Sequence, residues 1–274
     1  MIGICTDSNS QLPASLAQRY GVEVVPLTIT IDDVDYLEGV DIDADAFYAR
    51  FADGQRPQVA ISEPSPGQFA VAYEELLARG CTEILSIHIS AALSGTINSA
   101  RLAAHSVPAS VRLVDSGTSG CGTSCCVWAA AAAIDGGATL DEAAQIAERL
   151  APTIGNVFVV GAIDPQRDGL DTDVDPADGL TVGTLRNGNL EVVGRHLTAL
   201  DAVNAMAAYA ISWGAGLRVA VGHSDAATTP LADALEAAVG EAANVIDVVR
   251  YRVGPSAGAH TGPGTVGCCM FPAP

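Results

Sequence analysis

The feature that most constrains this chain is a regular alternation of short β-rich runs and helical stretches over residues 1–150. Such alternation predicts a parallel sheet covered by helices, because the chain needs a long crossover, usually a helix, to return to a parallel strand. We therefore predict an α/β fold whose N-terminal part is a parallel sheet covered by helices. The predicted strands are 1–5, 22–31, 83–87 and 111–114, and the predicted helices are 11–20, 43–51, 68–79, 96–105, 124–134 and 140–150.

The second part of the chain follows a different pattern and predicts a smaller α/β domain. Two β-runs flank Asn187-Gly188, and this dipeptide between β-runs indicates a hairpin. Residues 164–179 carry repeated aspartates among prolines and glycines, which predicts an irregular acidic loop. We place the domain boundary near residue 152, giving an N-terminal domain of 1–152 and a C-terminal domain of 153–274. The remaining predicted elements are strands at 157–161, 217–221 and 245–251 and helices at 200–211 and 230–239.

Charge excludes several classes of protein. The net charge of −19 disfavours binding to nucleic acid or to an anionic membrane, because both begin with neutralisation of phosphates. All 13 basic residues are arginine, so a Schiff-base lysine, a P-loop lysine and a kinase lysine are excluded. Neither a membrane-spanning run nor a basic, apolar leader is recognisable, so we expect a cytoplasmic protein without stable membrane insertion.

The seven cysteines predict neither a disulfide framework nor a zinc site. Their number is odd, and the two vicinal pairs lack the C-x2-C spacing that zinc ligands prefer. Cys125 and Cys126 open an alanine-rich stretch, where we interpret them as small apolar helix residues, with metal or redox chemistry as the alternative. We expect no metal and no cofactor.

Four segments rich in small hydroxyl residues follow predicted strands. In open α/β sheets ligands bind at the carboxyl ends of strands, against the N-termini of helices. Each segment alone is explained as a helix cap, but four together predict a binding cleft for an anionic head group. The segments are Thr6-Asp7-Ser8, Ile61-Ser62-Glu63-Pro64-Ser65, Leu93-Ser94-Gly95-Thr96 and Asp115-Ser116-Gly117.

His260 lies in a glycine-rich stretch, 258–267, that we interpret as a ligand-contacting loop, a structural histidine being the alternative. Gly262–Gly267 fits G-x-G-x-x-G, but too few residues follow it for a dinucleotide-binding unit. Ser94 lacks the flanking glycines of a nucleophile elbow. His223-Ser224-Asp225 ends a predicted strand, and we expect this segment to cap the next helix rather than to line a cleft.

In this order along the chain, these segments resemble the signatures of the DegV family. The resemblance covers nearly the whole chain. It rests on Thr6-Asp7-Ser8, similar to T-D-S; Val25-Pro26-Leu27 followed by residues 35–42, similar to v-P-L … y-x-D-G-x-d-I; residues 62–66, similar to T-S-Q-P-S-P; residues 89–96, similar to I-S-S-x-L-S-G-T; Val114-Asp115-Ser116; and residues 258–264.

The resemblance implies a two-domain DegV-like fold that holds one long-chain fatty acid in an apolar tunnel. It implies a carrier without catalytic residues of its own, which presents the fatty acid to a separate ATP-dependent fatty acid kinase. The absence of lysine agrees with a chain that does not bind ATP itself. By position, Ser62, Ser94 and His260 would hold the carboxylate, and the neighbouring residues at this site would be Gly95, Thr96 and Thr261.

Two departures from the family pattern keep alternatives open. Ile61 stands where the family has threonine, so one hydroxyl at the head group is missing. The family's Gly-Gly-Arg segment is not recognisable; Arg167 stands among aspartates there, and Arg195 is the next candidate cation. A different acid as ligand, or no kinase partner, therefore remains an alternative, as does a hydrolase using Ser94 and His260 or an inert structural relative.

Overall fold

The computed structural model describes residues 1–161, 179–186 and 189–273, which group into two compact units. The first unit contains Met1–Asp41 and Ala60–Thr153, and the second contains Ile42–Val59 and Ile154–Ala273. The predicted acidic loop from Asp164 to Asp178, with Arg167, and the turn Asn187-Gly188 lie outside the described residues.

The first unit is built on a four-stranded sheet in the order β2-β1-β6-β7, and every neighbouring pair is parallel. The prediction of a parallel sheet is thereby confirmed. The strands are β1 (Ile2–Asp7), β2 (Glu23–Val25), β6 (Glu83–His88) and β7 (Ser110–Asp115).

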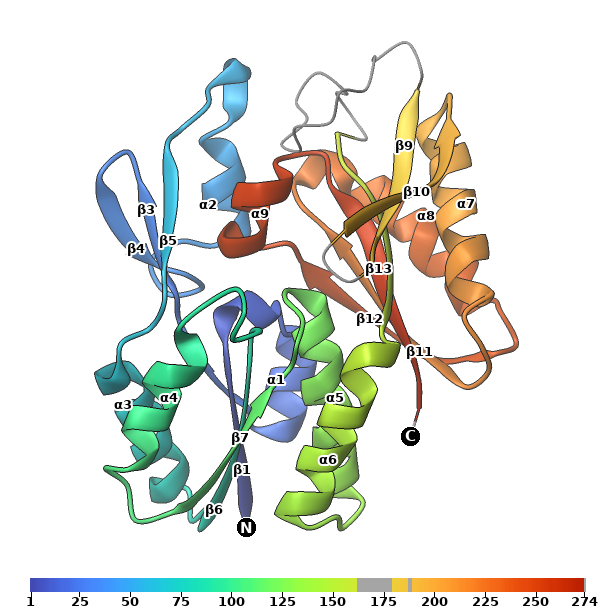
Figure 1. The fold of residues 1–274 in the computed structure, drawn as a ribbon. Coiled ribbons are helices and arrows are strands. Elements are labelled where there is room, and N and C mark those ends of the chain that lie inside the picture. Colours follow the sequence, from blue (N-terminus) through green and yellow to red (C-terminus); the bar gives the residue numbers. More distant parts are fainter. Residues whose placement is uncertain (162–178, 187–188, 274) are drawn as a thin grey trace. The chain divides into compact units, whose positions relative to one another are not determined.

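Helices cover both faces of this sheet (Figure 1). One face carries α3 (Pro66–Ala78) and α4 (Thr96–Ala104), and the other carries α1 (Ala14–Tyr20), α5 (Cys121–Asp135) and α6 (Leu140–Leu150). Because both faces are covered, strands such as β6 are almost wholly buried. Capping boxes at Ser65–Gln68 and Thr139–Glu142 fix where α3 and α6 begin.

A small three-stranded sheet, in the order β4-β3-β5, extends the first unit. Its strands are β3 (Thr28–Ile31), β4 (Val34–Leu37) and β5 (Val59–Ser62). The predicted strand 22–31 is divided between β2 and β3 in different sheets, with Pro26 between them, because proline has no N–H for a ladder. Asp32 and Asp33, both with positive φ, form the turn between β3 and β4.

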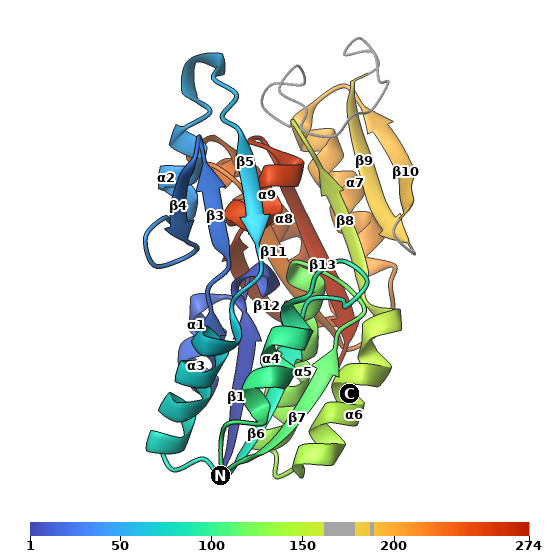
Figure 2. The same ribbon diagram turned by 60° about the vertical axis from the view of Figure 1, so that its left-hand side comes forward.

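The second unit is built on a mixed six-stranded sheet in the order β10-β9-β8-β13-β11-β12. Only β11 and β12 pair in parallel; the other neighbours are antiparallel. Figure 2 shows β9 and β10 as the expected antiparallel neighbours. The strands are β8 (Gly155–Val159), β9 (Leu180–Arg186), β10 (Asn189–His196), β11 (Leu217–His223), β12 (Val245–Arg252) and β13 (Val266–Pro272).

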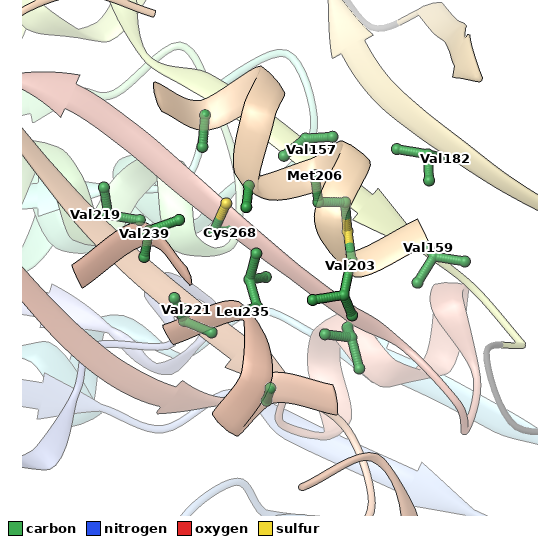
Figure 3. Packing of buried hydrophobic residues seen from close by; sticks show 14 of the residues in the cluster. Val157, Val159, Val182, Val203, Met206, Val219, Val221, Leu235, Val239 and Cys268 are labelled. Atoms are coloured by element: carbon green, nitrogen blue, oxygen red, sulfur yellow. The ribbon is translucent and has the colours of Figure 1, made fainter. Parts of the chain in front are cut away.

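One face of this sheet packs against α7 (Ala199–Ile211) and α8 (Thr229–Gly240). Figure 3 shows how side chains of these two helices and of the strands point into one apolar core. Met206 of α7 and Leu235 of α8 lie among Val159, Val221 and Cys268 of the strands, all nearly inaccessible to solvent.

Residues 42–59 group with the second unit, although the sequence boundary near 152 places them in the N-terminal domain. The segment contains α2 (Ala44–Ala49), whose Phe47 and Tyr48 pack closely on Gly258 of α9 (Pro255–Thr261), so that a Cβ at Gly258 would clash with the Tyr48 hydroxyl. Asp45 also pairs with Arg252 at 2.7 Å. The division of the chain is therefore set by contacts between distant segments, which a single cut along the sequence cannot represent.

No helix in the described ranges is long and apolar enough to cross a membrane.

Candidate functional site

In the first unit, the segment before α4 places Ser94, Gly95 and Thr96 at the start of that helix. Gly95 is the N-cap and Thr96 the first helical residue. Ser94 is half-buried; its Oγ lies 2.8 Å from Thr96 Oγ1 and accepts the Thr96 N–H at 3.2 Å. The half-buried Ser94 hydroxyl therefore lies at the N-terminus of α4, a position that suits a negatively charged or strongly polar head group, whereas the Thr96 hydroxyl is inaccessible to solvent.

Carboxylates from neighbouring strands hold this segment in place. Asp7 Oδ2 accepts the Ile89 N–H at 3.1 Å, and Asp115 Oδ1 accepts the Ala91 N–H at 3.2 Å. The Ser90 N–H donates to the Thr118 carbonyl at 2.8 Å. Three backbone donors around residue 90 are thus fixed, so the position of Ser94 follows from the ends of β1 and β7.

Ile61 and Ser62 are the last two residues of β5, so this segment lies at the carboxyl end of a strand, although no strand was predicted for residues 59–62. Ile61 is half-buried and Ser62 is exposed. The residue that reaches α4 is the next one: Glu63 Oε1 would lie 2.9 Å from a Cβ built on Gly95. The structure therefore brings Glu63 beside Gly95, and the sequence analysis named Glu63 within the segment without giving it a role.

In the second unit, His260 and Thr261 form the last turn of α9 and not a loop. The loop interpretation of this part of the stretch was wrong, because Pro255 starts a helix and the Gly262 N–H closes it on the Gly258 carbonyl. His260 is exposed, and Thr261 Oγ1 donates to the Ala257 carbonyl at 3.4 Å.

The segment after His260 is held by Ser224 and Asp225. Asp225 Oδ2 accepts the Gly264 N–H at 2.7 Å, and Ser224 Oγ accepts the Thr265 N–H at 2.8 Å. Asp225 Oδ1 also accepts the Thr228 N–H at 3.2 Å and so caps the short 3-10 turn Ala226–Thr228 that leads into α8, whereas the N-cap of α8 itself is Thr228. The position of α9 and its C-terminal loop is thus fixed by residues at the end of β11.

Arg195 lies on β10, an edge strand of the sheet, and is exposed. β10 is three strands from β13, which corresponds to about 14 Å across a sheet. A role of Arg195 at the head group stays a prediction.

A buried polar chain that the sequence analysis did not identify crosses the first sheet. His88 Nδ1 lies 3.0 Å from Asp7 Oδ2, His88 Nε2 lies 2.6 Å from Ser86 Oγ, and Ser86 Oγ lies 2.8 Å from Tyr73 Oη. The first three residues have the connectivity of a Ser-His-Asp triad. All four side chains are inaccessible to solvent, so a substrate cannot reach Ser86. We therefore interpret this hydrogen-bonded network as a structural feature of the first sheet. Burial also raises the pKa of Tyr73 well above its usual value.

His223, at the end of β11, has a strongly shifted pKa. Burial, together with the neighbouring Arg252 and Arg250, lowers the pKa of His223 to about 4. Arg250 Nη2 lies 3.4 Å from His223 Nδ1 and also binds Asp233 and Glu236 on α8. His223 is therefore an uncharged hydrogen-bonding residue at neutral pH.

All seven cysteines are buried and unbridged, in agreement with the interpretation of Cys125 and Cys126 as apolar helix residues. Burial raises the pKa of Cys126 to about 12 and raises those of Cys5 and Cys268 further, so the reactive thiolate is disfavoured. Within the described ranges, no group of three or more His, Cys, Asp or Glu side chains is placed to hold a metal ion.

Sequence comparison identifies related proteins. A family model described as "Uncharacterised protein, DegV family" matches residues 1–168. A DegV domain-containing protein of Streptomyces coelicolor is 35% identical over 276 residues, covering 97% of this chain and 96% of that protein. A DegV domain-containing protein of Deinococcus radiodurans is 32% identical and covers 99% of this chain and 98% of that protein.

Solved structures show the same fold. A structure described as "Fatty Acid Binding of a DegV family Protein from Thermus thermophilus" superposes with a TM-score of 0.82, at 29% identity, and covers 99% of both chains. DegV from Bacillus subtilis, described as a fatty acid binding protein, has a TM-score of 0.77 at 22% identity and covers 98% of both chains. At that lower identity the second match shows the fold alone.

Proposed function

The chain belongs to the DegV family, and from this premise we propose that it binds one long-chain fatty acid as a carrier. The observation that carries the proposal is the similarity to the Thermus thermophilus protein, which extends over 99% of both chains and whose description names fatty acid binding. The half-buried hydroxyl of Ser94 at the start of α4 supports it, since it offers a donor to a polar head group, and the buried Thr96 hydroxyl, 2.8 Å away, holds it in position.

We propose that Ser62, Ser94, Gly95 and Thr96 contribute to head-group binding from the first unit, and His260 and Thr261 from the second. The first set is supported by the start of α4, and the second by the resemblance of residues 258–264 to the family signature and by the exposed position of His260 in the last turn of α9. The role of each set is tested by variants within that set.

The acyl chain supplies most of the binding free energy in this proposal. A fatty acid with about 14 buried methylenes gains roughly 11 kcal/mol at ~0.8 kcal/mol each, before the cost of association is subtracted. We expect the gain that is left after this cost to keep a lipid bound through purification.

The test is displacement of a fluorescent fatty acid by palmitate, followed by titration with palmitate methyl ester as the control for the head group. We expect palmitate to displace the probe at a ratio of one per chain. Failure of palmitate and of oleate to displace any probe contradicts the proposal.

We further propose that this cytoplasmic carrier presents the bound fatty acid to a separate kinase and is not catalytic alone. The proposal is supported by the absence of lysine from the sequence, which removes the usual ligand of ATP phosphates. The protein with ATP and palmitate alone should give no acyl phosphate, and addition of a fatty acid kinase catalytic subunit should produce it. Acyl phosphate formed without the kinase contradicts the carrier role.

A further inference from the structure

The carboxylate of Glu63 lies at the start of α4, at the position where the head group is proposed to bind. Its Oε1 would be 2.9 Å, and its Cδ 3.5 Å, from a Cβ built on Gly95, so the carboxylate is in contact with the N-cap residue of that helix. Ser62 precedes Glu63, and Ser94 precedes Gly95. A negative charge of the chain itself is therefore placed among the hydroxyls assigned to the ligand.

The charge of Glu63 is not neutralised by a neighbouring group in the described part of the chain. No ion pair or hydrogen bond of its carboxylate is recorded there, and the side chain is exposed. Residues 61–67 and 89–98, which surround it, contain no other titratable side chain. The charged groups on the adjoining strands are committed elsewhere: Asp115 accepts the Ala91 N–H, and Asp7 is paired with His88.

We propose that Glu63 selects a head group that donates a hydrogen bond, so that a fatty acid binds here in its protonated form. This inference rests on the fatty-acid-binding function proposed above. Two carboxylates in contact cannot both stay ionised, because their repulsion favours a shared proton. On binding, one proton is taken from solvent, the acid O–H donates to Glu63, and no covalent bond of the ligand changes. A fatty alcohol satisfies the same acceptor without any proton uptake.

A purely structural role for Glu63 makes a different prediction. An acid at a helix N-terminus stabilises the helix through the dipole. In that case replacement by glutamine lowers the stability of the protein slightly, and neither the affinity for a fatty acid nor the uptake of protons changes.

The experiment is titration calorimetry at pH 7.5 in two buffers with different ionisation enthalpies, which gives the protons taken up per bound ligand. The probes are dodecanoate and 1-dodecanol, and the proteins are the wild type, Glu63→Gln and the matched control Glu74→Gln. Glu74 is an exposed acid on α3, eleven positions along the chain, and carries the same charge. Thermal unfolding of each variant checks its fold.

We expect the wild type and Glu74→Gln to take up about one proton with dodecanoate and none with 1-dodecanol. Glu63→Gln should take up none and bind dodecanoate about 10- to 100-fold more tightly. Two results overturn the selection by Glu63 and leave the carrier function standing. One is binding of dodecanoate to the wild type without proton uptake. The other is equal proton uptake and equal affinity for dodecanoate in the wild type and in Glu63→Gln. If neither probe binds to any of the three proteins, the carrier function is overturned as well.

Discussion

Asp7 and His88 come from strands β1 and β6, and their side chains meet at 3.0 Å with neither accessible to solvent. Asp7 also accepts the Ile89 N–H, and this bond fixes the start of the segment that leads to Ser94. A buried pair therefore links the interior of the first sheet to the proposed head-group residues.

Removal of either member of this pair should destabilise the protein strongly. We expect Asp7→Ala and His88→Ala each to lower the free energy of unfolding by about 3 kcal/mol or more, because the remaining partner is left buried without its hydrogen bond. The loss of unfolding free energy in the double variant should be at least ~1 kcal/mol smaller than the sum of the losses in the two single variants. Urea unfolding of the four proteins measures this coupling, and strictly additive losses would show that the pair does not act as a unit.

Ser94→Ala should weaken fatty-acid binding by about tenfold, the effect of one lost hydrogen bond of ~1.4 kcal/mol. The control is Ser99→Ala on the same helix, where the side chain is half-buried and away from the helix start. Displacement titrations compare the two variants with the wild type. Equal effects of the two substitutions would remove Ser94 from the head-group site.

His260→Ala tests the second unit independently. His260 is exposed at the last turn of α9, so its loss should leave the free energy of unfolding within ~0.5 kcal/mol and weaken fatty-acid binding by roughly tenfold. His105→Ala, an exposed histidine at the end of α4, is the control. An affinity that stays unchanged in His260→Ala contradicts its assignment.

Ile61→Thr should improve fatty-acid binding by several-fold, because threonine adds a hydroxyl donor at the end of β5 and keeps a β-branched side chain. Ile61→Val is the matched control, since valine has nearly the shape of threonine without the hydroxyl. The measurement is the same displacement titration at one pH. If threonine and valine give the same affinity, residue 61 does not contact the head group.

Acid should destabilise the protein in part through His223. The pKa of His223 is about 4 in the folded protein against 6.5 for the free side chain, so between these values the unfolded state binds the extra proton. The stabilising contribution is therefore present above pH 6.5 and lost as pH falls towards 4. We expect His223→Gln to lose up to ~2–3 kcal/mol less stability than the wild type between pH 7 and pH 4.5. Urea unfolding of both proteins at the two pH values measures these losses. An identical loss of stability in the wild type and in His223→Gln would contradict the shifted pKa.

Much of the fold could be predicted from the sequence because apolar strands and amphipathic helices have distinct periods. The elements that were missed are β4, β5, β13 and α9. β13 was missed because Gly262 and Gly264, just before it, indicate a turn. Its vicinal cysteines, Cys268 and Cys269, are also not typical strand formers. Its central place in the second sheet follows from antiparallel pairing with β8 and β11, which local patterns do not encode.

The proposed head-group residues of the first unit could be located from hydroxyl segments that follow strands. Ser62 ends β5, and Ser94 and Thr96 lie at the start of α4, after the residues that follow β6. The contact of Glu63 with Gly95 could not be predicted from the sequence, because it depends on how the chain passes from β5 to α3 beside α4. The pairing of Asp7 with His88 likewise joins residues 81 positions apart and depends on the register of β1 against β6.

The most direct test of the carrier function is mass spectrometry of the purified recombinant protein under native and denaturing conditions. We predict a native mass that exceeds the chain mass by one long-chain fatty acid, and release of that acid on denaturation. A spectrum of apo protein alone, unchanged after incubation with palmitate or oleate, would contradict the account.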